Sequence, residues 1–208
     1  MLSAVGLLVG CASANLGSNS NPDGQPGDSQ NEPDTSPPDS APVQATLQQT
    51  TNTTVTDLNS VACAQIDGNG NTVGAGNNID GFDNGVKITG DINIVSAGAN
   101  ILADTGDGVL IDGDDNKVTA GNLIYGETEG VEIEGNENDV SAGGDIVGDF
   151  GNGVEIDGDG NTVGAGDDID GGDVGVLIDG DDNIVTAVDN IFGAVSYTHL
   201  TLPTNREV

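Results

Sequence analysis

Short apolar segments recur between Val61 and Gly193 at intervals of 22 or 23 residues. Each unit reads V-x-I, then N-x-V, then a single Ile, with polar residues between these segments. Because successive side chains of a strand point to opposite faces, this period of two predicts three short β-strands per unit and excludes helices. The register is set by the isoleucines of the first segment, which are Ile66, Ile88, Ile111, Ile133, Ile156 and Ile178.

Glycine follows the first and third segments of most units, where a chain that turns sharply needs positive φ or has no room for a side chain. Three strands and three turns in about 22 residues form one coil of a solenoid. The sequence therefore predicts an all-β, right-handed parallel β-helix with about six visible coils of 22 or 23 residues. Strands of neighbouring coils lie ~4.8 Å apart.

One asparagine occupies the same position of every unit. A column of buried amides satisfies its own hydrogen bonds when each amide stacks on the next, whereas unpaired buried amides are costly. We therefore interpret this column as a structural ladder and not as a catalytic or ligand-binding set. Its members are Asn71, Asn93, Asn116, Asn138, Asn161 and Asn183.

The N-terminal residues 1–11 are apolar and end in Leu8-Val9-Gly10-Cys11, which resembles the bacterial lipobox. The resemblance implies a lipoprotein signal that is cleaved before Cys11, and lipidation of Cys11 as a membrane anchor. No Lys or Arg precedes Cys11, which departs from the pattern. The alternative is an apolar N-terminus with a buried thiol.

The other regions differ in composition. Residues 12–44 are rich in Pro, Ser, Asn and Asp and predict a disordered tether. Residues 45–60 are β-prone and are expected to cap the repeats of residues 61–193. Residues 194–208 resemble the in-frame translation of a sequencing adapter, so we interpret them as an artefact and expect the stack to be truncated at its C-terminal end.

The repeat unit G-V-x-I-[DE]-G-[DN]-x-N resembles the pectate-lyase-like right-handed β-helix superfamily, in particular its NosD-like and carbohydrate-binding and sugar-hydrolase repeats. The resemblance covers residues 61–193 and implies architecture more than activity. The superfamily includes polysaccharide lyases, hydrolases, epimerases, adhesins and structural rods, and a fold alone does not select among them.

The charge and the few basic residues limit the function. A net charge of -32 opposes binding to nucleic acid. Lyases of the superfamily use a basic side chain, but Lys87 and Lys117 fall in different strand columns. Carboxylate pairs are available for acid–base work, yet they recur at turns, so we assign no catalytic residue and lean away from an enzyme.

Acidic residues at the turn after the first segment form the main outward feature. The motif D-x-[DN]-x-N offers oxygen ligands of the kind that calcium prefers, although it is not an EF-hand. The metal-ligand candidates are Asp112, Asp114, Asp157, Asp159, Asp179 and Asp181. The alternative is a solvated, acid-adapted surface whose carboxylates repel one another and are screened by salt.

Two smaller features complete the predictions. Cys63 stands near the cap without a CxxC motif and is expected to be a half-buried free thiol. The outward residues Leu102, Tyr125 and Val147 of the third segment are candidates for a contact face.

Together these features predict a lipid-anchored, extracytoplasmic β-helix repeat protein in the outer membrane, periplasm or cell surface. Its expected role is structural, adhesive or glycan-contacting, with the membrane, polysaccharide and envelope components as partners. The alternative is the N-terminal fragment of a β-helix polysaccharide lyase or hydrolase whose catalytic coils are missing.

Overall fold

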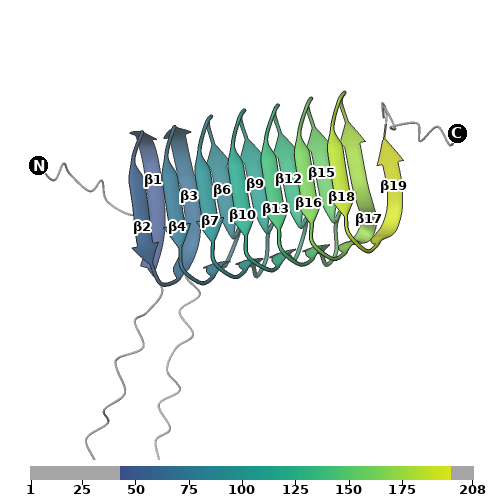
Figure 1. Cartoon of the computed structure of the whole chain (residues 1–208), viewed down its shortest axis with the longest axis horizontal. Coiled ribbons are helices and arrows are strands. Elements are labelled where there is room, and N and C mark those ends of the chain that lie inside the picture. The colour runs from purple at the N-terminus through teal and green to yellow at the C-terminus, as the bar shows by residue number, and fades with distance from the viewer. Residues whose placement is uncertain (1–42, 198–208) are drawn as a thin grey trace, which may run out of the picture.

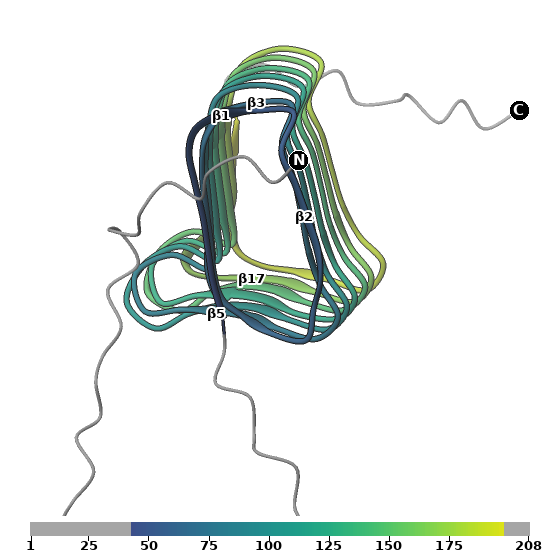
Figure 2. The same cartoon turned by 90° about the vertical axis from the view of Figure 1, so that its left-hand side faces the viewer.

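A computed structural model describes residues 43–197. These residues form nineteen β-strands and no helix. Figure 1 shows the strands stacked side by side as a rod, and Figure 2 shows that each coil encloses a closed, roughly triangular outline. The fold is therefore all-β, with parallel strands stacked as a solenoid of about six coils, as the repeat pattern predicts.

Each coil contributes one strand to each of three columns. The first column contains β3 (Val61–Asn69), β6 (Val86–Thr89), β9 (Val109–Asp112), β12 (Val131–Glu134) and β15 (Val154–Asp157). The second contains β4 (Thr72–Ala75), β7 (Ile94–Ala97), β10 (Lys117–Ala120), β13 (Asp139–Ala142), β16 (Thr162–Ala165) and β18 (Ile184–Ala187). The third contains β5 (Ile79–Gly81), β8 (Ile101–Ala103), β11 (Ile124–Gly126) and β14 (Ile146–Gly148).

The columns join into two hydrogen-bonded sheets. The second column, with β2 (Thr54–Leu58), forms a seven-stranded sheet. The first and third columns form one twelve-stranded sheet, because β17 (Ile169–Asp179) runs without interruption from a third strand into the next first strand. Pairing is parallel throughout and joins equivalent residues, as where Ile133 pairs with Ile111 on one side and Ile156 on the other. A residue thus lies beside its counterpart 22 or 23 positions away.

The interior contains columns of Val, Ile and Ala. Ile66, Ile88 and Ile111 are at most 1% exposed. The second-strand valines are fully buried except Val185 of the last coil, which is partly buried. Each inward side chain packs on its counterparts in the coils above and below, so one motif repeated six times makes one continuous core.

The two glycine turns differ in their physical requirement. Gly113, after a first strand, has φ +147°, which a residue with a side chain rarely adopts. Gly126, the last residue of β11, has no such φ, but a Cβ there would clash with the carbonyl group of Glu129.

The residue before each ladder asparagine adopts a left-handed conformation. Gly70 and Gly160 fill this position in two coils, but Ile92, Asp115, Glu137 and Asp182 fill it in others with φ between 56° and 60°. Ile92 is 61% exposed. A β-branched residue is unfavourable in this conformation, and the hydrogen bonds of the stack impose it. The repeat pattern gave no indication of this strain.

The segment expected to be a cap continues the stack as an incomplete coil. β1 (Val43–Thr51) pairs with β3, and β2 pairs with β4, each in parallel but with register shifts. At the other end, β19 (Ile191–Tyr197) pairs with β17, so the sheet extends into residues 194–197.

The predicted lipobox and nearly all of the tether lie outside the described residues. Among residues 43–197 no helix reaches the length and hydropathy of a membrane span.

The prediction of a half-buried free thiol at Cys63 is wrong. Cys63 is disulfide-bonded and 5% exposed. The absence of a CxxC motif argued against a reactive thiol pair, but a disulfide needs only proximity in space, which motif spacing does not report. Cys11, the only other cysteine of the sequence, lies outside the described residues.

Candidate functional site

The asparagine column is a continuous hydrogen-bonded ladder inside the coil. The Oδ1 of Asn116 accepts from the backbone N–H and the side-chain Nδ2 of Asn93, at 2.9 and 3.1 Å. Its own Nδ2 donates to the Oδ1 of Asn138 at 3.1 Å and to the carbonyl oxygen of Gly90 at 2.9 Å. Each ladder asparagine is at most 9% exposed. Their amides are used by the fold, which leaves them poorly suited to a ligand.

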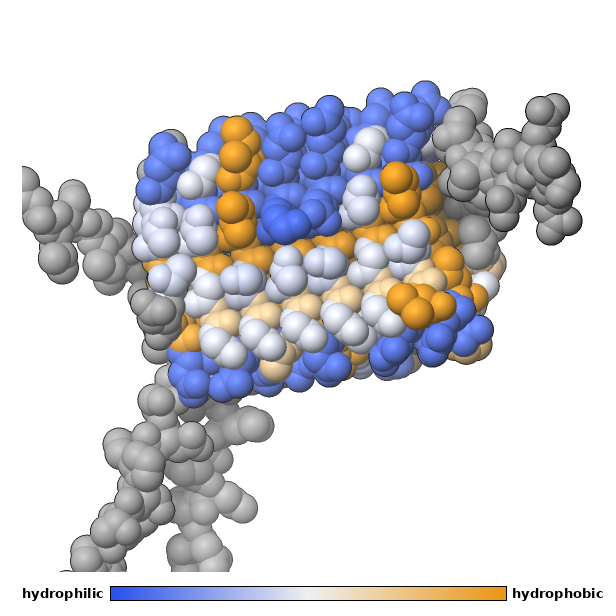
Figure 3. Space-filling view, in the orientation of Figure 1, coloured by the Kyte–Doolittle hydropathy of each residue, from blue (hydrophilic) through white to orange (hydrophobic). Residues whose placement is uncertain are grey.

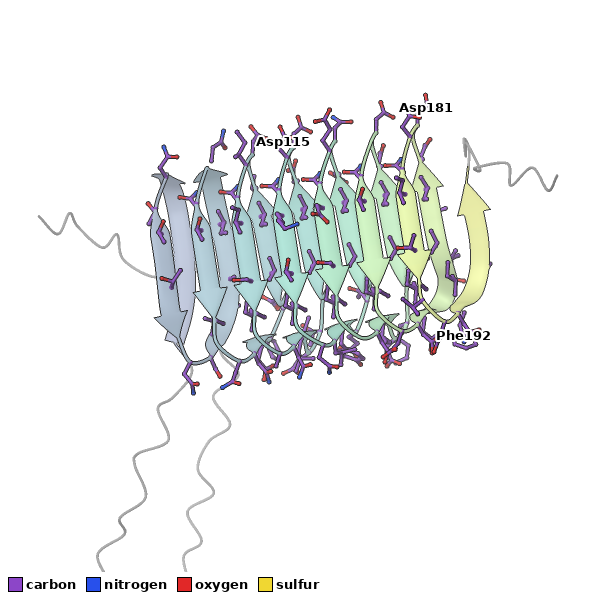
Figure 4. All side chains as sticks on the ribbon, in the orientation of Figure 1. Asp115, Asp181 and Phe192 are labelled. Carbon is purple, nitrogen blue, oxygen red and sulfur yellow. The ribbon has the colours of Figure 1, made fainter. Side chains whose placement is uncertain are left out.

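A second ladder follows the acidic turn on the outside. The Oδ1 of Asp114 accepts from the backbone N–H of Asn136 at 2.7 Å, and the Oδ1 of Asn136 accepts from that of Asp159 at 2.9 Å. Asp159 accepts in the same way from Asp181 at 2.7 Å. Figure 4 places Asp181 and Asp115, a turn residue of an earlier coil, along one edge of the rod. Both Asp and Asn occur in this ladder because either side chain supplies the acceptor oxygen.

The structure does not gather the six candidate metal ligands into one site. Asp112, Asp157 and Asp179 end first strands, Asp114, Asp159 and Asp181 lie two residues later, and all six are exposed. Among residues 43–197, three carboxylates whose oxygens converge within 4.8 Å occur elsewhere, at Asp107, Glu129 and Glu132. Calcium binding by the six aspartates stays a prediction.

The convergent carboxylates join two parts of the coil. Glu132 is an outward residue of β12, whereas Asp107 and Glu129 lie in the loops that connect a third strand to the next first strand. Asp107 is only 7% exposed, accepts from the hydroxyl group of Thr128, and accepts from the backbone N–H of Glu129 at 3.3 Å. Two successive loops therefore each bring one carboxylate against the outer surface of the sheet.

The same loop-to-strand contact recurs in other coils. In the next coil the Nδ2 of Asn152 donates to the Oε2 of Glu155 at 2.6 Å. Near the N-terminal end, loop residues 82–84 and the strand residues Gln65 and Lys87 line a pocket of about 160 Å³. We call this side of the rod the loop-side face. It comprises the outward first-strand residues Gln65, Lys87, Leu110, Glu132 and Glu155 with loops 82–84, 104–107, 127–129 and 149–152, which project from one corner in Figure 2.

Crowding of carboxylates changes the proton affinity of this face. Burial, followed by repulsion from Asp107 and Glu129, raises the pKa of Glu132 to about 7. Burial, and then a hydrogen bond and repulsion from Asp107, raise the pKa of Glu129 above its usual range. A carboxylic acid that holds its proton near neutral pH can donate it, which an exposed carboxylate cannot do.

We expect Glu132 to make the protein less stable as the pH rises from about 4.5 to about 7. A carboxyl group with a raised folded-state pKa favours folding when protonated, so its contribution is complete below the unfolded value and is lost as the pH passes the folded value. The expected loss is about 1 kcal/mol after allowance for solvent screening. Urea unfolding at pH 4.5 and 7.5 measures it.

Glu132→Gln should flatten this part of the stability profile. Glu134→Gln, an exposed position on the same strand, is the matched control and should retain the slope. An unchanged slope in Glu132→Gln would show that Glu132 does not titrate in this window.

The two lysines do not converge. Lys87 lies on β6 of the twelve-stranded sheet and lines the pocket, whereas Lys117 lies on β10 of the seven-stranded sheet and pairs with Asp139.

The candidate contact residues Leu102, Tyr125 and Val147 do form one column, because Tyr125 pairs with both of the others in neighbouring third strands.

Apolar residues elsewhere on the surface are scattered. Ile92, Ile94, Ile184 and Val188 are each at least 45% exposed. The face seen in Figure 3 is mostly polar or pale, with separate apolar patches. This distribution does not mark one large apolar interface on that face.

The loop-side face was missed by the repeat analysis. A signal was present, since four glutamates occur within eight residues, at Glu127, Glu129, Glu132 and Glu134. The repeat pattern assigns these residues to a loop and a strand but does not show that the loop folds back onto the strand.

Comparison with protein-family models, curated proteins and solved structures finds no match to this chain.

Proposed function

We propose that this chain is an extracytoplasmic β-helix repeat protein that contacts glycans through its loop-side face and has a structural or adhesive role in the cell envelope. The resemblance of its repeats to pectate-lyase-like, NosD-like and sugar-hydrolase repeats supports this proposal. The observation that carries it is the recurrent contact between loops and outward first-strand residues, which lines one side of the rod with amide, carboxylate and ammonium groups.

A face of this kind suits an extended polymer. Lys87, Leu110, Glu132 and Glu155 occupy one register column, so they follow one another at the ~4.8 Å coil spacing. Polar groups arranged in a row can hydrogen-bond successive hydroxyl groups of a chain that lies along the rod. A nucleic acid partner is disfavoured by the charge of -32.

Affinity electrophoresis of the full chain in gels that contain a neutral, an amino or an acidic polysaccharide tests the proposal. We expect retardation by at least one of them relative to a gel without polysaccharide. Bovine serum albumin, another acidic protein, should migrate equally in all gels. Absence of retardation in every gel would reject glycan contact.

The disulfide of Cys63 supports an extracytoplasmic location, because disulfides persist in oxidising compartments. A competing proposal rests on the lipobox resemblance of Leu8-Val9-Gly10-Cys11: a lipid on Cys11, in place of a disulfide, attaches the protein to the membrane. One sulfur atom cannot carry both a thioether and a disulfide, so lipidation of Cys11 and an intrachain disulfide of Cys63 exclude one another.

Paired variants decide whether the anchor exists. If Cys11 is lipidated, we expect Cys11→Ser to move the protein from the membrane to the soluble fraction, while Cys63→Ser remains in the membrane. Globomycin, which blocks lipoprotein signal cleavage, should then cause the precursor to accumulate. Membrane partitioning that is the same in both variants would reject the anchor and leave the glycan proposal intact.

A second candidate function is glycoside hydrolysis. It is favoured by one observation, the convergence of Asp107, Glu129 and Glu132 with a pKa near 7 for Glu132. Retaining glycosidases place an acid and a nucleophilic carboxylate about 5 Å apart. Reducing-end release from a bound polysaccharide, lost in Glu132→Gln and retained in Glu134→Gln, would establish it. A polysaccharide lyase is less well supported, since Lys87 and Lys117 lie on different sheets.

Cations are expected to stabilise the folded chain. Folding stacks carboxylates of the acidic turns within the ~8 Å screening length of physiological salt. Thermal unfolding with CaCl₂, and with NaCl at the same ionic strength, separates two cases. Equal shifts of the midpoint would mean screening, whereas a larger shift with calcium at millimolar concentration would mean chelation by Asp112, Asp114, Asp157, Asp159, Asp179 and Asp181.

A further inference from the structure

We propose that the pocket beside Phe82 binds one uncharged sugar residue of the glycan. This proposal rests on the proposed function and names the ligand class and the contact residues. The pocket lies at the N-terminal part of the loop-side face and has a volume of about 160 Å³. Its lining contains both a hydrophobic ring and several hydrogen-bonding side chains.

Phe82 supplies the aromatic part of the pocket, and Cys63 and Ala64 also line it. It is 37% exposed although it is a large apolar residue, and it lies in the loop after β5. A pyranose ring presents C–H groups on one face, and an aromatic ring can cover that face without requiring polar partners. An aromatic side chain beside polar groups therefore fits a sugar better than it fits an inorganic ion.

The polar part can both donate and accept hydrogen bonds. Gln65, Asp83, Asn84 and Lys87 line the pocket. The Oδ1 of Asn84 accepts from the backbone N–H of Asp107 at 2.9 Å, which orients its amide from the neighbouring loop. Hydroxyl groups donate and accept at once, so a mixed set of amide, carboxylate and ammonium groups complements them.

Charge favours an uncharged residue over an acidic one. The lining contributes one carboxylate, Asp83, and one ammonium group, Lys87. Their charges are opposite, so the lining itself does not strongly favour a cationic or an anionic ligand. The whole chain carries a charge of -32, which repels a polyanion. A hydroxyl-rich neutral sugar avoids this repulsion and still uses both side chains.

Isothermal titration of the full chain with neutral, amino and acidic oligosaccharides of equal length tests the inference. Because the charge of -32 also attracts a cationic amino sugar, the titrations are compared at high salt, where this attraction is screened. We expect the neutral oligosaccharide to bind tightest there, and Phe82→Ala to weaken that binding about tenfold. Phe150→Ala is the matched control, since Phe150 is 72% exposed in a corresponding loop and does not line the pocket. It should bind as the parent chain does.

The outcomes separate this inference from the proposed function. Tightest binding of the amino or the acidic oligosaccharide at high salt, or equal effects of the two phenylalanine variants, would overturn the inference while glycan contact remains. Absence of binding to all three oligosaccharides would overturn both. Circular dichroism of each variant shows whether the β-helix is retained, and Lys87→Met tests the pocket independently of Phe82.

Discussion

Replacement of Asn116 by Ala is expected to lower the free energy of unfolding by about 3–5 kcal/mol. The side chain is 1% exposed and lies in the middle of the stack, where solvent cannot replace it. Its Oδ1 is the acceptor for two N–H groups of Asn93, and its Nδ2 donates to Gly90 and Asn138.

The cost arises mainly from the partners that remain. Without the Asn116 amide, the two N–H groups of Asn93 and the carbonyl group of Gly90 each lose a hydrogen bond inside the coil. A buried polar group without a partner costs about 1–3 kcal/mol. The ladder also connects each coil to the next. Loss of the Asn116 amide therefore weakens the packing between neighbouring coils as well as the local hydrogen bonds.

Equilibrium unfolding in urea, followed by circular dichroism, measures this effect. Asn136→Ala is the matched control, because Asn136 belongs to the exposed ladder and water can replace its hydrogen bonds. We expect it to cost less than about 1 kcal/mol. Similar losses for the two variants would contradict the structural role assigned to the inner ladder.

Replacement of Gly126 by Ala is expected to destabilise the protein by about 3 kcal/mol, although only one methyl group is added. A Cβ at this position would lie 2.5 Å from the backbone nitrogen of Gly108 and still closer to the carbonyl oxygen of Glu129. Both obstacles are backbone atoms, so relief requires movement of the loop or of the neighbouring coil. The same loop carries Glu129 of the carboxylate cluster.

Gly164→Ala provides the contrast. Its Cβ would meet the Oγ1 of Thr186 at 3.5 Å, an ordinary contact, and its backbone does not need positive φ. We expect it to be neutral or slightly stabilising, because Ala restricts the unfolded chain. Thermal unfolding of both variants measures the difference. If Gly126→Ala were as stable as Gly164→Ala, the close turn after the third strand would not constrain the fold.

The strained turn position illustrates why some features escape sequence reasoning. Ile92 lies where Gly70 and Gly160 occur in other coils, and its φ of 60° is imposed by its place in the stack. Residues with intrinsic preference for this conformation, such as Gly and Asn, would have revealed it. Ile92 and Glu137 conceal it, since their local preference opposes the left-handed conformation.

The sequence by itself determined the coil. An exact recurrence of Val, Ile, Ala and Asn at 22 or 23 residues leaves one way to bury every apolar side chain, which is to stack equivalent strands in parallel. The same recurrence placed the asparagines in one column, because parallel in-register pairing sets each residue beside the equivalent residue of the next coil.

Only the tertiary structure decided what the outside of the rod can do. The loops after the third strands are not periodic in composition, and their return onto the first strands brings Glu129 to Glu132 and Phe82 to Lys87. The disulfide of Cys63 likewise depends on proximity in space. Repetition constrains neighbours that lie one coil apart, whereas contacts within a coil depend on loop paths that the period does not encode.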